Sequence, residues 1–141
     1  MNDMWKCLYE AAENVQNARM VSDYIEAGQV AAAILTKNKN IYTGICIDTA
    51  CSLGMCAERN AIAHMLTCGE SEIVKLAVIM PDGTLGLPCG ACCEFMLQLG
   101  EWAGDIEILT DYEKRASKTL KELFPYWWGK KSKSVRMDTH D

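Results

Sequence analysis

The sequence is poor in histidine, in basic residues and in long apolar runs. Its two histidines leave only His64 for a histidine-based catalytic group, because His140 stands next to the end of the chain. Acidic residues outnumber basic ones by 19 to 14, and the net charge of −5 argues against a nucleic-acid-binding face. No apolar run approaches the roughly eighteen residues of a membrane span, and the N-terminus is charged where an export signal is apolar. We therefore expect a cytoplasmic protein with no nucleic-acid and no membrane partner.

Cysteine, by contrast, is abundant, with eight in a chain of 141 residues, the size of one ordinary domain. A cytoplasmic protein keeps its thiols reduced, so each cysteine is expected to pack as a small hydrophobe or to bind metal. Four of them have no partner motif and are expected to fill the core: Cys7, Cys46, Cys51 and Cys68.

Apolar periodicity predicts an α/β domain over residues 1–128, followed by a solvated tail over residues 129–141. The predicted helices cover about 4–18, 56–66, 89–100 and 116–124, and the predicted strands cover 30–35, 41–47, 73–80 and 106–110. The first two strands flank an asparagine-rich turn, which indicates a β-hairpin. The later alternation of strand and helix predicts parallel strands joined by crossover helices.

Two cysteine motifs fall at the expected starts of helices, Cys56-Ala-Glu-Arg59 and Pro88-Cys-Gly-Ala-Cys92. The positive end of a helix lowers thiol pKa values, so thiolates are favoured there. The Cys-x-x-Cys spacing puts Cys89 and Cys92 on one side of a turn, where they can chelate a tetrahedral ion, and Cys56 would supply a third sulfur. Three thiolates with one open position describe a catalytic zinc site, whereas a fourth would close it. Cys93 is the alternative fourth ligand, although adjacent helical residues point about 100° apart.

Glu58 distinguishes a catalytic from a purely structural metal site. It points into the middle of the apolar face of its predicted helix, where an unpaired carboxylate costs several kcal/mol. Two residues from a metal ligand, a general acid/base that shuttles protons explains this position. The alternative is a buried ion pair with Arg59 or Lys75.

In combination, the two motifs resemble the signature of the zinc-dependent cytidine deaminase superfamily, in its small nucleoside-acting branch that includes blasticidin-S deaminases. Residues 30–35, 44–48 and 123–128 are similar to further segments of that family. The resemblance implies a three-layer α/β fold with a central mixed sheet of about five strands flanked by helices. It also implies that residues 1–128 are the catalytic domain and that the protein is a homotetramer.

The resemblance further implies a hydrolase that acts on the C–N bond of a cyclic amidine. Zn²⁺ held by Cys56, Cys89 and Cys92 activates a water, Glu58 transfers its proton, and ammonia leaves cytidine or a related aminated nucleoside, as in pyrimidine salvage. The substrate-binding positions implied are Cys46, Asp48, Ala57 and Trp128, the last covering the base, often from a neighbouring subunit.

The sequence departs from the family at its substrate-binding positions. Cys46 and Asp48 stand where the family carries asparagine and glutamate, and Gly28 stands where an aromatic is common. Cys93 and Glu94 follow the last motif cysteine in place of arginine and glutamine. Two alternatives therefore accompany the deaminase interpretation: a blasticidin-S-type deaminase, and a non-catalytic zinc-stabilised binding protein of the same fold.

Overall fold

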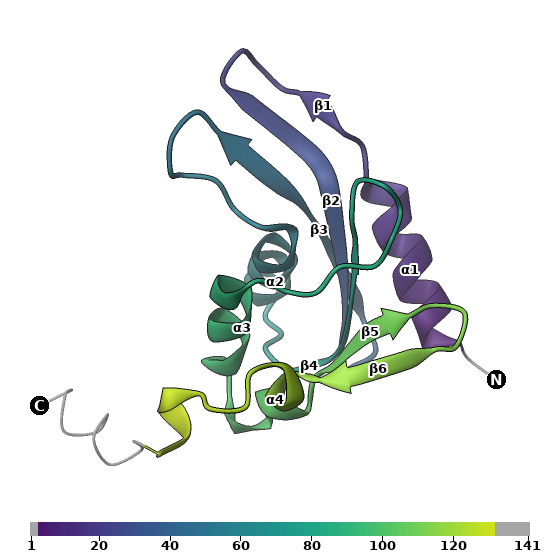
Figure 1. Cartoon of the computed structure of the whole chain (residues 1–141), viewed down its shortest axis with the longest axis vertical. Helices are drawn as coiled ribbons and strands as arrows, with labels where there is room; N and C mark the ends of the chain where they lie inside the picture. The colour runs from purple at the N-terminus through teal and green to yellow at the C-terminus, as the bar shows by residue number, and fades with distance from the viewer. Residues whose placement is uncertain (1–2, 132–141) are drawn as a thin grey trace, which may run out of the picture.

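A computed structural model describes residues 3–131, which form one mixed sheet of six strands between two layers of helices (Figure 1). The strands are β1 (Arg19–Met20), β2 (Ile25–Thr36), β3 (Ile41–Thr49), β4 (Ile73–Ile79), β5 (Glu107–Asp111) and β6 (Ala116–Thr119). The helices are α1 (Met4–Val15), α2 (Ala57–Thr67), α3 (Gly90–Leu97) and α4 (Leu120–Leu123), with 3-10 turns η1 (Glu101–Asp105) and η2 (Trp128–Lys131). The predicted three-layer α/β fold is thereby confirmed, with six strands rather than about five.

The long strand β2 organises the sheet. It pairs with β3 along one side, and on its other side with β1 near its start and with β4 over its second half, always antiparallel. The register to β3 shifts between Ala27 and Ala31, where Gly28 has a φ of 86° and an added Cβ would lie 2.1 Å from the carbonyl oxygen of Asn17. Only glycine fits this bulge.

The two faces of the sheet carry separate apolar cores. On one face, α1 buries Trp5 and Leu8 against small residues of β2 and against β4. On the other face, α2 and α3 bury Ile62, Met65 and Met96 against the same two strands. In Figure 1, α1 and the α2–α3 pair accordingly lie on opposite sides of β2. Both cysteine motifs therefore belong to one layer.

The predicted last helix is wrong over its first half. Ala116–Thr119 pairs antiparallel with β5 as strand β6, and helix α4 is only one turn long. The helix begins at Leu120 because the Thr119 hydroxyl and the Glu122 carboxylate cap each other's backbone N–H groups. The spacing of Ala116, Leu120 and Leu123 resembles a helical period although its first member lies in a strand. The predicted parallel pairing holds for β4 with β5 alone.

Three of the four cysteines predicted to fill the core, Cys7, Cys51 and Cys68, are exposed, and only Cys46 is buried. The helical spacing that includes Cys7 does not by itself say which side of α1 faces the sheet. His64 is exposed, as expected.

Of the predicted tail over residues 129–141, residues 129–131 lie in η2 and the others lie outside the described residues. Among residues 3–131, no helix combines the length and the apolar character needed to cross a membrane.

The packing of α2 on β3 yields a stability prediction. A Cβ added to Gly44 would lie 2.3 Å from the backbone nitrogen of Ala61 and 2.5 Å from the carbonyl oxygen of Ala57. Because both are backbone atoms, Gly44→Ala must displace α2, and we expect it to lower the unfolding midpoint by roughly 3–10 °C. The matched control is Gly104→Ala, whose added methyl group meets only the Lys121 side chain at 3.4 Å. Equal midpoints for the two variants, measured by circular dichroism, would contradict the prediction.

Candidate active site

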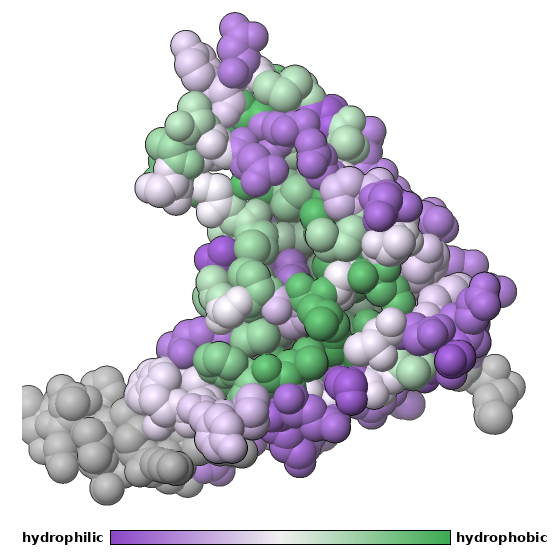
Figure 2. All heavy atoms as spheres, viewed as in Figure 1, coloured by the Kyte–Doolittle hydropathy of each residue, from purple (hydrophilic) through white to green (hydrophobic). Residues whose placement is uncertain are grey.

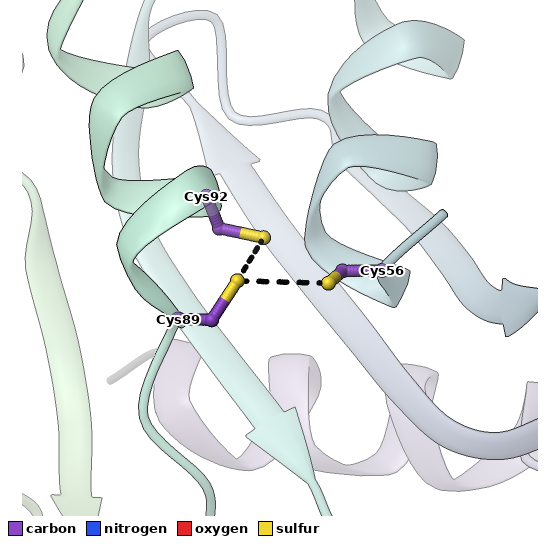
Figure 3. Close-up of side chains that lie close together, drawn as sticks. All are labelled: Cys56, Cys89 and Cys92. Atoms are coloured by element: carbon purple, nitrogen blue, oxygen red, sulfur yellow. Dashed lines mark hydrogen bonds between the residues drawn. The ribbon is translucent and has the colours of Figure 1, made fainter. Parts of the chain in front are cut away.

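The three motif cysteines meet where two helices begin. Cys56 is the N-cap residue of α2, Cys89 is the N-cap residue of α3, and Cys92 lies in the first turn of α3. The Sγ atoms of Cys56 and Cys89 are 3.6 Å apart, and those of Cys89 and Cys92 are 3.5 Å apart (Figure 3). All three sulfur atoms lie within 4.8 Å of one another. The three predicted metal ligands are thus brought together.

The arrangement fits zinc. In a tetrahedral site with Zn–S bonds of about 2.3 Å, neighbouring sulfurs stand about 3.8 Å apart, close to the separations seen. Among the described residues, these three cysteines form the one group of metal-ligand type. The Cys93 thiol instead donates a hydrogen bond to the carbonyl oxygen of Pro88 at 3.6 Å. The structure therefore supports three protein ligands and an open fourth position, the pattern of a catalytic zinc site.

Arg59 places a positive charge next to the thiol groups. Its Nη2 donates to the Sγ of Cys56 at 3.5 Å, and the hydrogen bonds to Cys56 and then Cys92 raise the pKa of the guanidinium further. Its Nε is the one buried side-chain nitrogen or oxygen in the described part of the chain that has no hydrogen-bond partner. Three thiolates holding Zn²⁺ would leave a net charge of −1, and this half-buried cation would offset the surplus.

The thiols differ in how easily they ionise. Burial, and next the charge of Glu58, raise the pKa of the fully buried Cys92. Burial also raises the pKa of Cys89, but hydrogen bonds from the backbone N–H of Cys92 and from neighbouring thiols outweigh it and lower the pKa overall. Without metal, Cys89 is therefore a readier thiolate than Cys92.

Glu58 lies beside the thiols, buried except for 5% of its surface. Burial raises the pKa of its carboxyl group, while a backbone N–H and the charge of Arg59 act in the opposite direction. No ion pair within residues 3–129 includes Glu58, so the alternative of a buried salt bridge with Arg59 or Lys75 is not realised, and Lys75 pairs with Glu107 at 3.0 Å. A carboxyl group in such surroundings can both accept and return a proton.

A cavity of about 360 Å³ opens in front of Glu58 and the thiols Cys56 and Cys89. This volume lies in the range of small-molecule sites. Apolar side chains from β2, β4 and the segment before α3 form much of its wall: Val30, Val78, Met80 and Leu87. Figure 2 shows hydrophobic residues gathered at the centre of the visible face, with hydrophilic residues around them.

Three of the four predicted substrate-binding residues line this cavity, namely Cys46, Asp48 and Ala57. Trp128 does not line it. Its indole N–H donates to one oxygen of Glu94 at 3.0 Å, and the indole N–H of Trp127 donates to the other at 2.9 Å. Glu94, which departs from the family pattern, therefore anchors the tandem tryptophans to α3.

Sequence reasoning missed several residues of the cavity wall, among them Gln29, Met80 and Leu87. Leu87 stands two residues before Cys89, so its closeness to a motif is a signal that could have found it. Gln29 and Met80 have no comparable signal, because the β2–β4 pairing that brings their strands together is set by tertiary structure.

Comparison with known proteins matches the part of the chain that holds both cysteine motifs to a known family. The family model described as "Cytidine and deoxycytidylate deaminase zinc-binding region" matches residues 6–104. The cytidine deaminase of Halalkalibacterium halodurans is 34% identical over 93 residues, which cover 58% of this chain and 70% of that protein. A cytidine deaminase of Mycobacterium tuberculosis is 28% identical over 101 residues, covering 71% of this chain and 72% of the relative.

Solved structures agree with the fold. The crystal structure of cytidine deaminase from Mycobacterium leprae has a TM-score of 0.72 at 22% identity, covering 89% of this chain and 100% of that chain. The cytidine deaminase structure from Burkholderia pseudomallei has a TM-score of 0.66 at 26% identity, covering 87% of this chain and 96% of that chain.

The ligand set predicts which cysteine variants lose metal. Cys89→Ala removes the sulfur that lies between the other two, so we expect loss of stoichiometric zinc and a lower unfolding midpoint, because the ion joins two segments. Cys93→Ala should retain zinc, since its thiol bonds a carbonyl oxygen instead. Metal content per chain, measured by atomic emission, checks both. Full zinc in Cys89→Ala, or its loss in Cys93→Ala, would contradict this ligand set.

Proposed function

Because this chain belongs to the cytidine and deoxycytidylate deaminase family, we propose that it is a zinc-dependent hydrolase that removes the exocyclic amine of cytidine or a closely related nucleoside and releases ammonia. One observation carries the proposal. Glu58 is buried in the wall of a ligand-sized cavity, beside three thiols that leave a fourth metal position open. That combination would give hydrolysis a proton carrier in Glu58 and, with zinc held by the three cysteines, an activated water.

Zinc held by Cys56, Cys89 and Cys92 would supply Lewis acidity, which makes water a competent nucleophile near neutral pH. Glu58 removes the proton of the attacking water as the water adds to the ring carbon that bears the amine. The same carboxyl group then passes that proton to the ring nitrogen. It next takes the remaining proton from the new hydroxyl group and gives it to the amine, so that a carbonyl forms, the C–N bond breaks and ammonia leaves. One carboxyl group thus acts first as base and then as acid.

The residues around Glu58 hold the site ready for this chemistry. Arg59 keeps its guanidinium against Cys56, so the excess negative charge of three thiolates is compensated within the same helical turn. Val30, Val78 and Leu87 provide apolar walls for a flat heterocycle. Asp48, at another part of the wall, offers carboxylate oxygens to donors on the group attached to the ring.

A non-catalytic, zinc-stabilised binding protein would have no use for Glu58. Burying an unpaired carboxyl group costs several kcal/mol, and a structural zinc site gains nothing from it. The three-ligand set argues in the same direction, since structural zinc sites use four protein ligands.

We further propose a homotetramer that works in the cytoplasm. Support for assembly comes from the apolar side chains left exposed on α2, α3 and the C-terminal segment, where Leu66, Phe95 and Trp128 lie. In such an assembly, Trp128 would cover the base in a neighbouring copy, since it does not reach the cavity of its own chain. Support for the compartment comes from all eight cysteines, which are free thiols in the structure.

The decisive test of function is ammonia release by zinc-loaded protein from cytidine, deoxycytidine, cytosine and blasticidin S. We expect turnover of cytidine or deoxycytidine, and a loss of about 10²–10⁴-fold in Glu58→Gln with zinc content unchanged. Glu113→Gln removes the same charge from the exposed β5–β6 turn and serves as the control. Near-normal turnover in Glu58→Gln would overturn the role of this residue. Release from blasticidin S alone would favour the antibiotic-detoxifying alternative, and no release from any compound would overturn the enzyme proposal.

Cys46 provides a test of substrate fit. Its Sγ accepts the backbone N–H of Val30 at 3.2 Å and lines the cavity, but a thiol is a poor donor to a sugar hydroxyl. Asparagine at this position can accept the same N–H and also donate into the cavity. We therefore expect Cys46→Asn to raise kcat/KM for cytidine by about three- to tenfold, which is the effect expected from one added hydrogen bond. An unchanged value would mean that the ribose does not contact this position.

A further inference from the structure

One end of the cavity lies near the stretch of β3 that pairs with residues 25–27 of β2. Asp48 lines the cavity there, two residues after Cys46 and on the same face of β3. Glu26 of β2 stands directly opposite Asp48 in the antiparallel register. Directly opposed residues have Cβ atoms about 5 Å apart on one face of a sheet, so Glu26 and Asp48 start from neighbouring positions. Glu26 does not itself line the cavity, but its carboxylate accepts a hydrogen bond from Gln29, which does.

Two hydrogen-bond donors near this pair are already engaged. The Nε2 of Gln29, a cavity residue, donates to the Oε2 of Glu26 at 2.5 Å. The Sγ of Cys46 accepts the N–H of Val30 at 3.2 Å. Ionised carboxylates only accept hydrogen bonds. This end of the cavity therefore offers acceptors and negative charge to a ligand.

The two carboxylates are not balanced by a neighbouring cation. Within residues 3–129, the four ion pairs involve neither Glu26 nor Asp48. Arg59 is the basic residue among those described that line the cavity, and it is engaged with Cys56. Like charges directly opposite each other across strands are destabilising, and a bound cation would relieve that repulsion.

We propose that Glu26 is a specificity-determining residue, which together with Asp48 selects substrates that carry a protonated amine on the group attached to the ring and disfavours those that carry a phosphate. The inference rests on the proposed deaminase function and specifies the substrate class of that site. An ammonium group can donate to both carboxylates and neutralises part of their charge. A hydroxyl donates one hydrogen bond and carries no charge, and a phosphate is repelled.

The test compares kcat/KM for cytidine with the values for its 3′-amino and 5′-amino analogues and for its 3′- and 5′-monophosphates. In the wild-type protein, we expect at least one amino analogue to exceed cytidine and both monophosphates to fall below it. Glu26→Gln keeps an acceptor for Gln29 but removes one charge, so the ratio of amino analogue to cytidine should fall about three- to fivefold. Glu26→Asp should retain most of the preference, and Glu113→Gln should leave the ratio unchanged.

A second measurement does not depend on the folding of a variant. Raising the salt concentration should lower the wild-type preference for the amino analogue, because screening weakens a partly exposed charge pair. If cytidine is turned over but the ratio is the same in Glu26→Gln, or insensitive to salt, the specificity proposal is wrong and the deaminase proposal stands. If no cytidine derivative is turned over, the deaminase proposal itself is overturned.

Discussion

The convergence of three thiol groups from two separate segments is the constraint on which the rest of the structure depends. Sulfur atoms less than 5 Å apart can be held only if α2 and α3 begin at the same place on the same face of the sheet. Strands β3 and β4 flank β2, so the segments that follow them enter one layer and start the two helices side by side. Gly44 allows α2 to approach β3 closely enough for this convergence.

One turn of helix then provides most of the chemistry. In the proposed mechanism, Cys56 binds metal, Glu58 carries protons and Arg59 offsets thiolate charge, and the three lie within four consecutive residues. The opposite end of the cavity is built differently, from residues of two strands that no local motif connects. Two of the departures from the family pattern, Cys46 and Asp48, lie there, which fits the proposed deaminase reaction with a substrate group of its own.

Much of this arrangement follows from local sequence. The spacing within the second cysteine motif predicts that Cys89 and Cys92 share a side, because helix geometry alone decides this. The same periodicity places Glu58 on the apolar face of α2. The periodicity argument fails at Ala116, because a helical spacing of apolar residues does not exclude an edge strand. Whether Ala116–Thr119 forms a strand depends on its pairing with β5, which the periodicity of this segment alone does not show.

The sequence by itself therefore determined the two cysteine motifs, the buried carboxyl group and most of the alternation of helices and strands, because each of these depends on residues within a few positions of one another. Only the tertiary structure decided that Cys93 bonds Pro88 rather than metal, that Trp128 lies against Glu94, and that Glu26 stands opposite Asp48. Each of these depends on strand register or on packing between distant segments. Such long-range contacts are set by the balance of the whole core, which no short stretch of sequence contains.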